Sequence, residues 1–192
     1  MDHKPALDKA IKTFDISNTH LLNSKHLEIA LEGSPVLFVE CTTGWVDNLL
    51  LTLHTLSPTG PVVACSKISY FSRNCYIALS DTRSSPVDRN SWTKLDRRGT
   101  LTGTYSFPYG SKTYAWKRTH NKELGAKRPS YKDFKLVEVD DPDDKVLAVY
   151  TSKAFMTSAA HDGRLRFFAE LEDDLEKLSL VAVLGTLERT RR

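Results

Sequence analysis

Short apolar segments separated by turn-forming residues make up most of the chain. Between residues 27 and 31, and again between 49 and 53, every second residue is apolar. A period of two places the apolar side chains on one face of a β-strand. This pattern, or a short apolar run, marks the predicted strands 27–31, 36–39, 49–53, 62–65, 75–79, 104–107, 113–118, 134–139, 146–150 and 165–171. Short strands separated by Gly, Pro, Asp and Ser are typical of a β-sandwich or a β-barrel.

Polar stretches between these strands predict loops and turns. Residues 81–98 are rich in Ser, Pro, Asp and Arg, and residues 120–133 are strongly basic, so both are expected to be loops. The Thr-Thr-Gly sequence at 42–44 predicts the end of a strand, and the acidic run 140–144 predicts a hairpin turn. No stretch has the composition of an interdomain linker, so we expect residues 1–192 to form a single domain.

The C-terminal residues follow a different pattern. Residues 178–187 contain no charged side chain, three carboxylates precede them at 172–174, and the chain ends in a cluster of cations. Charges of these signs at these two ends stabilise a helix dipole, so we predict an α-helix over residues 172–190. Its apolar side chains point in nearly every direction, and such a helix must be buried on all sides. A closed ring of strands meets this requirement, whereas a sheet with one covered face does not.

A further buried strand is the alternative for residues 178–187. Val181 and Val183 suit a strand, and Gly185 costs a helix about 1 kcal/mol relative to Ala. The acidic start and the basic end favour the helix. The apolar run is also much shorter than the roughly 20 residues that a membrane-spanning helix needs, so no transmembrane segment is predicted.

The N-terminus and the cysteines bear on cellular location. Residues 1–14 lack the apolar run of a signal peptide, and residues 1–12 are expected to be flexible or loosely packed. The three cysteines, Cys41, Cys65 and Cys75, form no Cys-x-x-Cys pair, and no glycosylation sequon occurs. We therefore expect a reduced protein of the cytoplasm or the nucleus, with peripheral membrane association if it binds lipid.

Charge is distributed unevenly along a chain of ordinary globular composition. The net charge is +3, with 40% hydrophobic and 27% charged residues. Residues 61–135 carry a balance of +10, whereas residues 1–60 carry −3 and residues 136–192 carry −4. The central segment could form a basic face that attracts phosphates. Alternatively, charges that are distant in the sequence neutralise one another in the folded protein.

The densest basic segment lies between residues 112 and 135. Its cations are Lys112, Lys117, Arg118, Lys122, Lys127, Arg128, Lys132 and Lys135, with Tyr114, Trp116 and Tyr131 between them. On a strand, Tyr114, Trp116 and Arg118 would share one face, with Ala115 and Lys117 on the other. One interpretation is phosphate binding; the other is that the aromatic residues belong to the core and the cations keep an exposed loop in solution.

No constellation typical of catalysis or metal binding occurs. There is no His-x-x-x-His pair, no Gly-x-Ser-x-Gly nucleophile elbow and no phosphate-binding glycine loop. The acidic run 140–144 lacks the glycine and the terminal glutamate of an EF-hand. The sequence also allows a metal site at which Cys41, His54 and Cys65 come together in space, although buried structural thiols are the usual case. We therefore expect no catalytic residue, no metal and no cofactor, and hence no enzyme.

The order of four parts resembles a known superfamily. The segment Thr113–Thr119 (Thr-Tyr-Ala-Trp-Lys-Arg-Thr), the acidic turn, the strand Lys145–Tyr150 and the terminal apolar helix are together similar to the tubby C-terminal-like superfamily. This superfamily comprises tubby proteins, phospholipid scramblases and LURP-one-related proteins, and the chain most resembles its small fungal members. The resemblance extends from about Thr13 to the C-terminus. It implies a mainly β fold, a closed antiparallel barrel of roughly 12 strands threaded by the C-terminal helix.

The resemblance also implies a class of function. Some members bind phosphoinositide headgroups, so we expect a non-catalytic binding or scaffold domain that recognises anionic phospholipids through a basic outer surface. The expected contacts are Lys117, Arg118, Lys122, Lys127 and Arg128. The chain lacks the Cys-rich run and the Pro-rich arm of scramblases, which argues against lipid scrambling.

The sequence leaves one other kind of binding protein possible and argues against a second. The alternative function is a protein-interaction module in stress or defence signalling, which needs an exposed apolar patch and no lipid ligand. A lipocalin-like barrel would need an empty lumen, which a central helix excludes, and nucleic acid is not an expected partner.

Overall fold

A computed structural model describes residues 9–21, 24–43, 48–69, 74–79, 92–98, 103–126, 132–153 and 162–191. Among these residues, the structure has twelve strands, the short 3-10 helix η3 (Lys122–Leu124) and the α-helix α1 (Asp173–Arg191). The strands are β1 (Lys12–Leu21), β2 (Ser24–Leu31), β3 (Ser34–Thr43), β4 (Asn48–Thr55), β5 (Val62–Ser69), β6 (Cys75–Leu79), β7 (Thr93–Arg98), β8 (Thr104–Tyr109), β9 (Lys112–Arg118), β10 (Phe134–Glu138), β11 (Val146–Ser152) and β12 (Gly163–Phe167).

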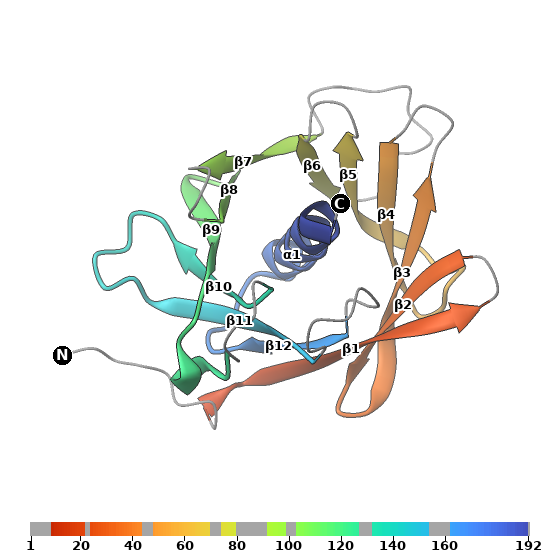
Figure 1. Cartoon of the computed structure of the whole chain (residues 1–192), viewed down its shortest axis with the longest axis horizontal. Helices are drawn as coiled ribbons and strands as arrows, with labels where there is room; N and C mark the ends of the chain where they lie inside the picture. Colours follow the sequence, from red (N-terminus) through yellow and green to blue (C-terminus); the bar gives the residue numbers. More distant parts are fainter. Residues whose placement is uncertain are drawn as a thin grey trace.

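The strands form a closed barrel around α1. Each strand pairs antiparallel with the next in the sequence, and β12 pairs with β1 to close the ring. Figure 1 shows α1 inside this ring, with strands on all of its sides. The predicted class, a mainly β closed barrel with a C-terminal helix inside it, is therefore confirmed.

Burial of α1 agrees with its sequence. Every residue from Leu178 to Glu188 is buried, and the four residues Val181–Leu184 are 0% exposed. Trp116 of β9 donates a hydrogen bond from its indole Nε1 to the backbone oxygen of Ser179, at 3.0 Å. The barrel wall therefore packs against the helix and also forms a hydrogen bond with it in the core.

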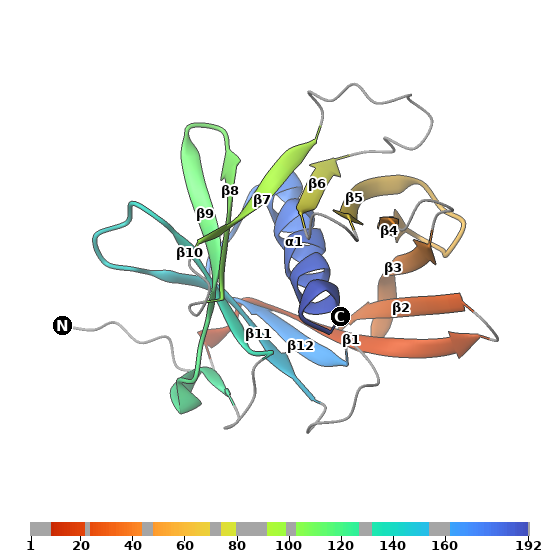
Figure 2. The ribbon, with the colours of Figure 1, turned by 45° about the horizontal axis from the view of Figure 1, so that its top comes forward.

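The helix lies closest to β5 and β6 (Figure 2). Small inward-facing side chains occupy this part of the wall, among them Ala64 and Ser66, and the helix presents Gly185 to them. Large rings fill the other side of the barrel from β8 through β12 to β1. They are Tyr105, Phe107, Trp116, Phe134, Tyr150, Phe167 and Phe14, all at most 2% exposed. Side-chain size thus determines where the helix sits in the barrel.

Two strands were not predicted. β1 has only two buried apolar positions, Phe14 and Ile16, before its sequence becomes polar, so the alternation is too short to indicate a strand. The prediction of a loop over 81–98 is wrong for Thr93–Arg98, which is β7. Leu95 is the buried residue of this strand, and its backbone pairing with β6 and β8 holds the other residues in place.

Several predicted boundaries also shift. β3 continues through Thr43, beyond the predicted break at 42–44, because its pairing with β4 extends to that residue. β12 ends at Phe167 and not at residue 171, since the chain turns there toward α1. The predicted loop 120–133 contains η3, whose start is capped by the Asn121 side chain. The hairpin turn at 140–144 is confirmed, and the predicted loop residues 81–91 lie outside the described residues.

Candidate functional site

The predicted basic segment divides between the two faces of β9. Tyr114 and Trp116 are buried inside the barrel, as the core interpretation proposed. Lys117 projects from the outer face, where it stands opposite Lys135 of β10. Arg118 lies two residues after Trp116 and so shares its face of the strand. The Arg118 guanidinium lies against Gly103, where an added Cβ would be 3.1 Å from the Arg118 Nε. Lys117 and Arg118 therefore face opposite sides of the wall.

The other three predicted contacts, Lys122, Lys127 and Arg128, do not lie on β9. Lys122 is exposed in η3, beyond the end of β9. Lys127 and Arg128 lie outside the described residues. Of the five predicted contacts, Lys117 is thus the one that the structure places on the outer face of a described strand.

The acidic turn covers part of this face. Asp144 accepts a hydrogen bond from Lys117 at 2.8 Å and another from Lys135 at 2.5 Å. Partial burial alone would raise the pKa of the Asp144 carboxyl, but the two ammonium groups outweigh it and lower that pKa. Asp144 is therefore ionised at neutral pH and partly offsets both lysines.

The strand register extends the basic face to β12. Lys117, Lys135, Val149 and Arg166 stand opposite one another in successive strands. We call Lys117, Lys135 and Arg166 the basic row. Strands lie about 4.8 Å apart, so Lys135 and Arg166 are separated by roughly 10 Å of sheet. The residue between them, Val149, is fully buried. The row combines residues that are up to 49 positions apart in the sequence.

Arg166 is the member of the row best suited to hold an anion. It is half-buried, and its Nη1 donates to the Thr151 hydroxyl at 3.4 Å. Among the described residues it forms no ion pair with a carboxylate, whereas its neighbour Arg164 pairs with Asp15 at 3.0 Å. Partial burial, and then the nearby Arg164 guanidinium, lower the pKa of Arg166, and the Asp15 carboxylate partly offsets them. The first two effects mean that the site would favour a bound anion.

The sequence around Arg166 also predicts an outward-facing cation, although it lies outside the densest basic segment, 112–135. In Arg164-Leu165-Arg166-Phe167 the cations alternate with residues that are buried in the core. On a strand, this alternation places both arginines on the outer face.

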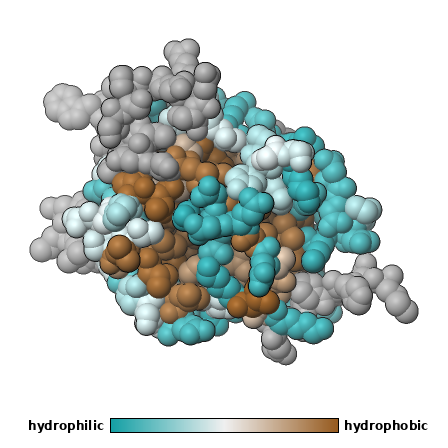
Figure 3. All heavy atoms as spheres, turned by 180° about the vertical axis from the view of Figure 1, so that it is seen from behind, coloured by the Kyte–Doolittle hydropathy of each residue, from teal (hydrophilic) through white to brown (hydrophobic). Residues whose placement is uncertain are grey.

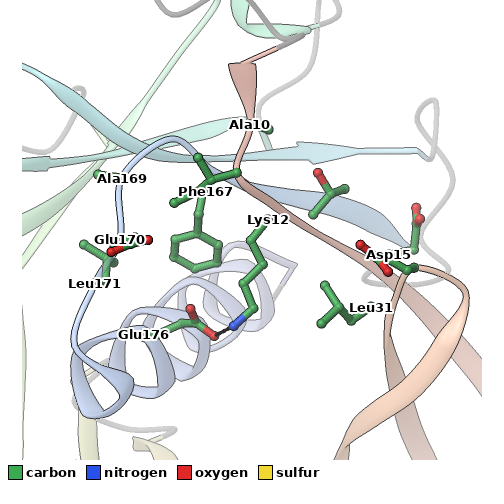
Figure 4. Close-up of a pocket in the computed structure, with 12 residues that line it drawn as sticks. Ala10, Lys12, Asp15, Leu31, Phe167, Ala169, Glu170, Leu171 and Glu176 are labelled. Atoms are coloured by element: carbon green, nitrogen blue, oxygen red, sulfur yellow. Dashed lines mark hydrogen bonds and ion pairs between the residues drawn. The ribbon is translucent and has the colours of Figure 1, made fainter.

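A separate pocket of about 640 Å³ lies where α1 begins, between the helix, β1 and β12. Figure 4 shows Lys12 and Glu176 meeting in this pocket, and their Nζ and Oε1 atoms are 2.6 Å apart. Glu32 and Glu170 add further negative charge, and Phe167 contributes apolar surface. The pocket has the volume of a small-molecule site, so the helix does not fill this end of the barrel as completely as its sequence suggested. Its acidic lining is unsuited to an anion.

Figure 3 faces the end of the barrel at which α1 begins. Hydrophilic residues gather near the centre of this end, and hydrophobic residues flank them. The acidic first turn of the helix, with Asp173, Asp174 and Glu176, belongs to this end. Arg166, at the β12 end of the basic row, stands opposite Thr13 of β1, which lines the pocket at this end of the barrel.

The cysteines and histidines do not assemble a metal site in the described part of the chain. No group of three or more His, Cys, Asp or Glu side chains lies close enough there to hold a metal ion. Cys41 stands opposite Leu51 on the inner face, whereas His54 stands opposite Phe38 on the outer face, so the suggested Cys41, His54 and Cys65 cluster does not form. Burial raises the pKa of the Cys75 thiol to about 11, which keeps it protonated.

These observations define a class of protein by architecture: a closed antiparallel barrel with a buried C-terminal helix and a row of cations on its outer wall. No model of a known protein family matches the chain, and its comparison with curated proteins found no match. Among the described residues, no helix is both long enough and apolar enough to cross a bilayer.

Proposed function

We propose that this chain is a non-catalytic binding domain of the tubby C-terminal-like type that recognises anionic phospholipid headgroups on its outer wall. The closed barrel and its internal helix are the architecture that the resemblance implies. The observation that carries the binding proposal is the half-buried Arg166 guanidinium, which lacks a carboxylate partner among the described residues and stands in register with Lys135 and Lys117.

The chemistry of the row suits a phosphate. A guanidinium presents several N–H donors in a plane and can donate two hydrogen bonds to one phosphate group. Lys135 and Lys117 add positive charge on flexible stems, which can follow a headgroup across the sheet. Partial desolvation of Arg166 strengthens its attraction for an anion relative to a fully solvated cation. The proposed contacts are thus Arg166 and Lys135 first, with Lys117 beside them.

Co-sedimentation with lipid vesicles tests this function. The chain is expected to bind phosphatidylcholine vesicles that contain phosphatidylinositol bisphosphate, and not vesicles of phosphatidylcholine alone. Each cation near an anionic surface contributes about 1 kcal/mol, so Arg166→Gln with Lys135→Gln should weaken binding by roughly thirtyfold. Lys94→Gln is the matched control, because Lys94 is an exposed cation of β7 outside the row. Equal binding by the double variant and the control would refute the proposal.

A protein-interaction module is the second candidate function. Such a module needs apolar surface that is accessible to a partner. Leu56, at the turn between β4 and β5, is 85% exposed and is the specific observation in favour of this candidate.

A further inference from the structure

Leu56 occupies a strained backbone conformation that turns its side chain into solvent. Its φ is 67°, in the left-handed region that leucine rarely adopts. The Ser57 N–H donates to the Thr55 oxygen at 2.7 Å, which closes a γ-turn with Leu56 at its centre. A γ-turn with positive φ is rare, and strain of this kind gathers at functional sites. Neither the strain nor the exposure helps the fold, so both require another explanation.

The turn around Leu56 is rigid. The Thr55 N–H donates to the Pro61 oxygen at 3.0 Å, and the His54 Nδ1 lies 2.9 Å from the Gly60 oxygen. Gly60 is tightly enclosed, since an added Cβ would lie 1.9 Å from the Thr55 oxygen. These contacts fix the position of Leu56 before any partner arrives, which lowers the entropy cost of binding.

A small pocket of about 160 Å³ opens beside this turn. Pro58 of the turn lines it together with Phe38, Glu28 and Glu40 from the outer faces of β2 and β3. Thr19 and His26 also line the pocket, and the two carboxylates supply its negative charge. Behind Glu40, the Nε2 atom of the 4% exposed His54 lies 3.8 Å from the Glu40 Oε2. A pocket this small holds one side chain and not a drug-sized ligand.

We propose that Leu56 and this pocket together dock a segment of a partner protein. An arginine or lysine of the partner enters the pocket, where its aliphatic stem packs on Phe38 and Pro58 and its charged end meets Glu28 and Glu40. An apolar residue next to that cation packs on Leu56. The negative charge of Glu28 and Glu40 favours a cationic side chain in the pocket. This surface and the basic row therefore bind ligands of opposite charge. The inference rests on the second candidate function and specifies the partner's chemistry.

Selection of peptides on the 192-residue chain tests the proposal. A random peptide library displayed on phage is expected to yield peptides in which arginine or lysine neighbours an apolar residue. Leu56→Ala and Glu40→Gln should each weaken binding of a selected peptide by about tenfold or more, because both remove a central contact. Ile11→Ala and Glu32→Gln are matched controls, since Ile11 is 57% exposed and Glu32 lies in a different turn. Thermal unfolding of each variant verifies that it is folded.

Replacement of the peptide's cation by neutral citrulline provides a second readout. Arginine-bearing peptide should shift backbone amide resonances of residues 26–40 and 54–60, and the citrulline peptide should not. Failure to enrich cationic peptides, or equal binding by Leu56→Ala and the wild type, would overturn the proposal. So would a concentration-dependent dimer that Leu56→Ala abolishes, because the occupant would then be a second copy. Vesicle binding by Leu56→Ala should stay at the wild-type level, which separates this surface from the basic row.

Discussion

Gly185 shows how one residue determines the position of the helix in the barrel. By propensity, a glycine inside a helix is unfavourable by about 1 kcal/mol relative to alanine, and this had counted against a helix at 178–187. In the structure, a Cβ at Gly185 would lie 2.4 Å from the Ser66 Oγ and 3.0 Å from the Cys75 Sγ. The glycine therefore permits the close approach of α1 to β5 and β6.

Gly185→Ala is expected to destabilise the protein although alanine is the better helix former. Overpacking costs about 1–3 kcal/mol, which exceeds the gain of about 1 kcal/mol in helix propensity. Urea unfolding should therefore show a lower midpoint for Gly185→Ala than for the wild type. Adding Ser66→Ala removes the nearest atom and should restore part of the loss, with Ser66→Ala alone as the reference. A higher midpoint for Gly185→Ala would contradict the close approach.

The elements that the sequence predicted are those whose own side chains form the core. β6 was predicted with its correct bounds because Cys75 and Ile77 alternate inward with no exposed apolar neighbour. β7 could not be predicted from its side chains, since one buried leucine gives no period and its place depends on backbone pairing with β6 and β8. Local pattern therefore predicts strands that contribute to the core and misses strands that the neighbouring strands hold in place.

The same limit applies to the candidate site. Lys117 was predicted from a local cluster of cations, and the structure places it on the outer face. Arg166 is brought beside Lys135 only by the register of β10, β11 and β12, which no local pattern contains. Arg118 was grouped with Lys117 as a contact although the period of two already assigned them to different faces.

Helix α1 is expected to be indispensable for folding. Its central residues are fully buried, so a barrel without them would expose the inward apolar side chains of many strands to water. Deletion of residues 175–192 should abolish the cooperative thermal transition and increase the binding of an apolar fluorescent dye. Thr190→Ala, at an exposed position near the end of the helix, is the control and should unfold as the wild type does. A truncated chain with a cooperative transition would show that the strands fold without the helix.

At the scale of the whole molecule, folding redistributes the charges of the sequence. The central residues 61–135, with a net charge of +10, meet the C-terminal residues 136–192, with a net charge of −4, at two places. Asp144 pairs with Lys117 and Lys135, and Glu138 pairs with Lys112 at 2.9 Å. Charges that are distant in the sequence therefore neutralise one another in part, as one of the two interpretations of the sequence expects. Some cations of the central segment are offset, and the basic row retains Arg166 from outside that segment.

Asp144 should limit anion binding by the outer wall, and Asp144→Asn tests this. Asn tolerates the positive φ of 45° at this position, so the turn should keep its shape. Loss of one negative charge beside Lys117 and Lys135 is worth about 1 kcal/mol at an anionic surface, which predicts roughly fivefold tighter binding to the bisphosphate vesicles.

Ionic strength and a matched variant distinguish this effect from a general change in net charge. The Debye length falls from about 10 Å at 0.1 M salt to about 3 Å at 1 M, so the gain of Asp144→Asn should shrink as salt rises. Asp96→Asn removes an exposed carboxylate that pairs with Lys94 on β7, and it should leave vesicle binding near the wild-type level. If both variants gain equally, net charge and not the basic row governs binding. If Asp144→Asn gains nothing, the lysines beside it do not contact the headgroup, and Arg166 would have to bind it without them.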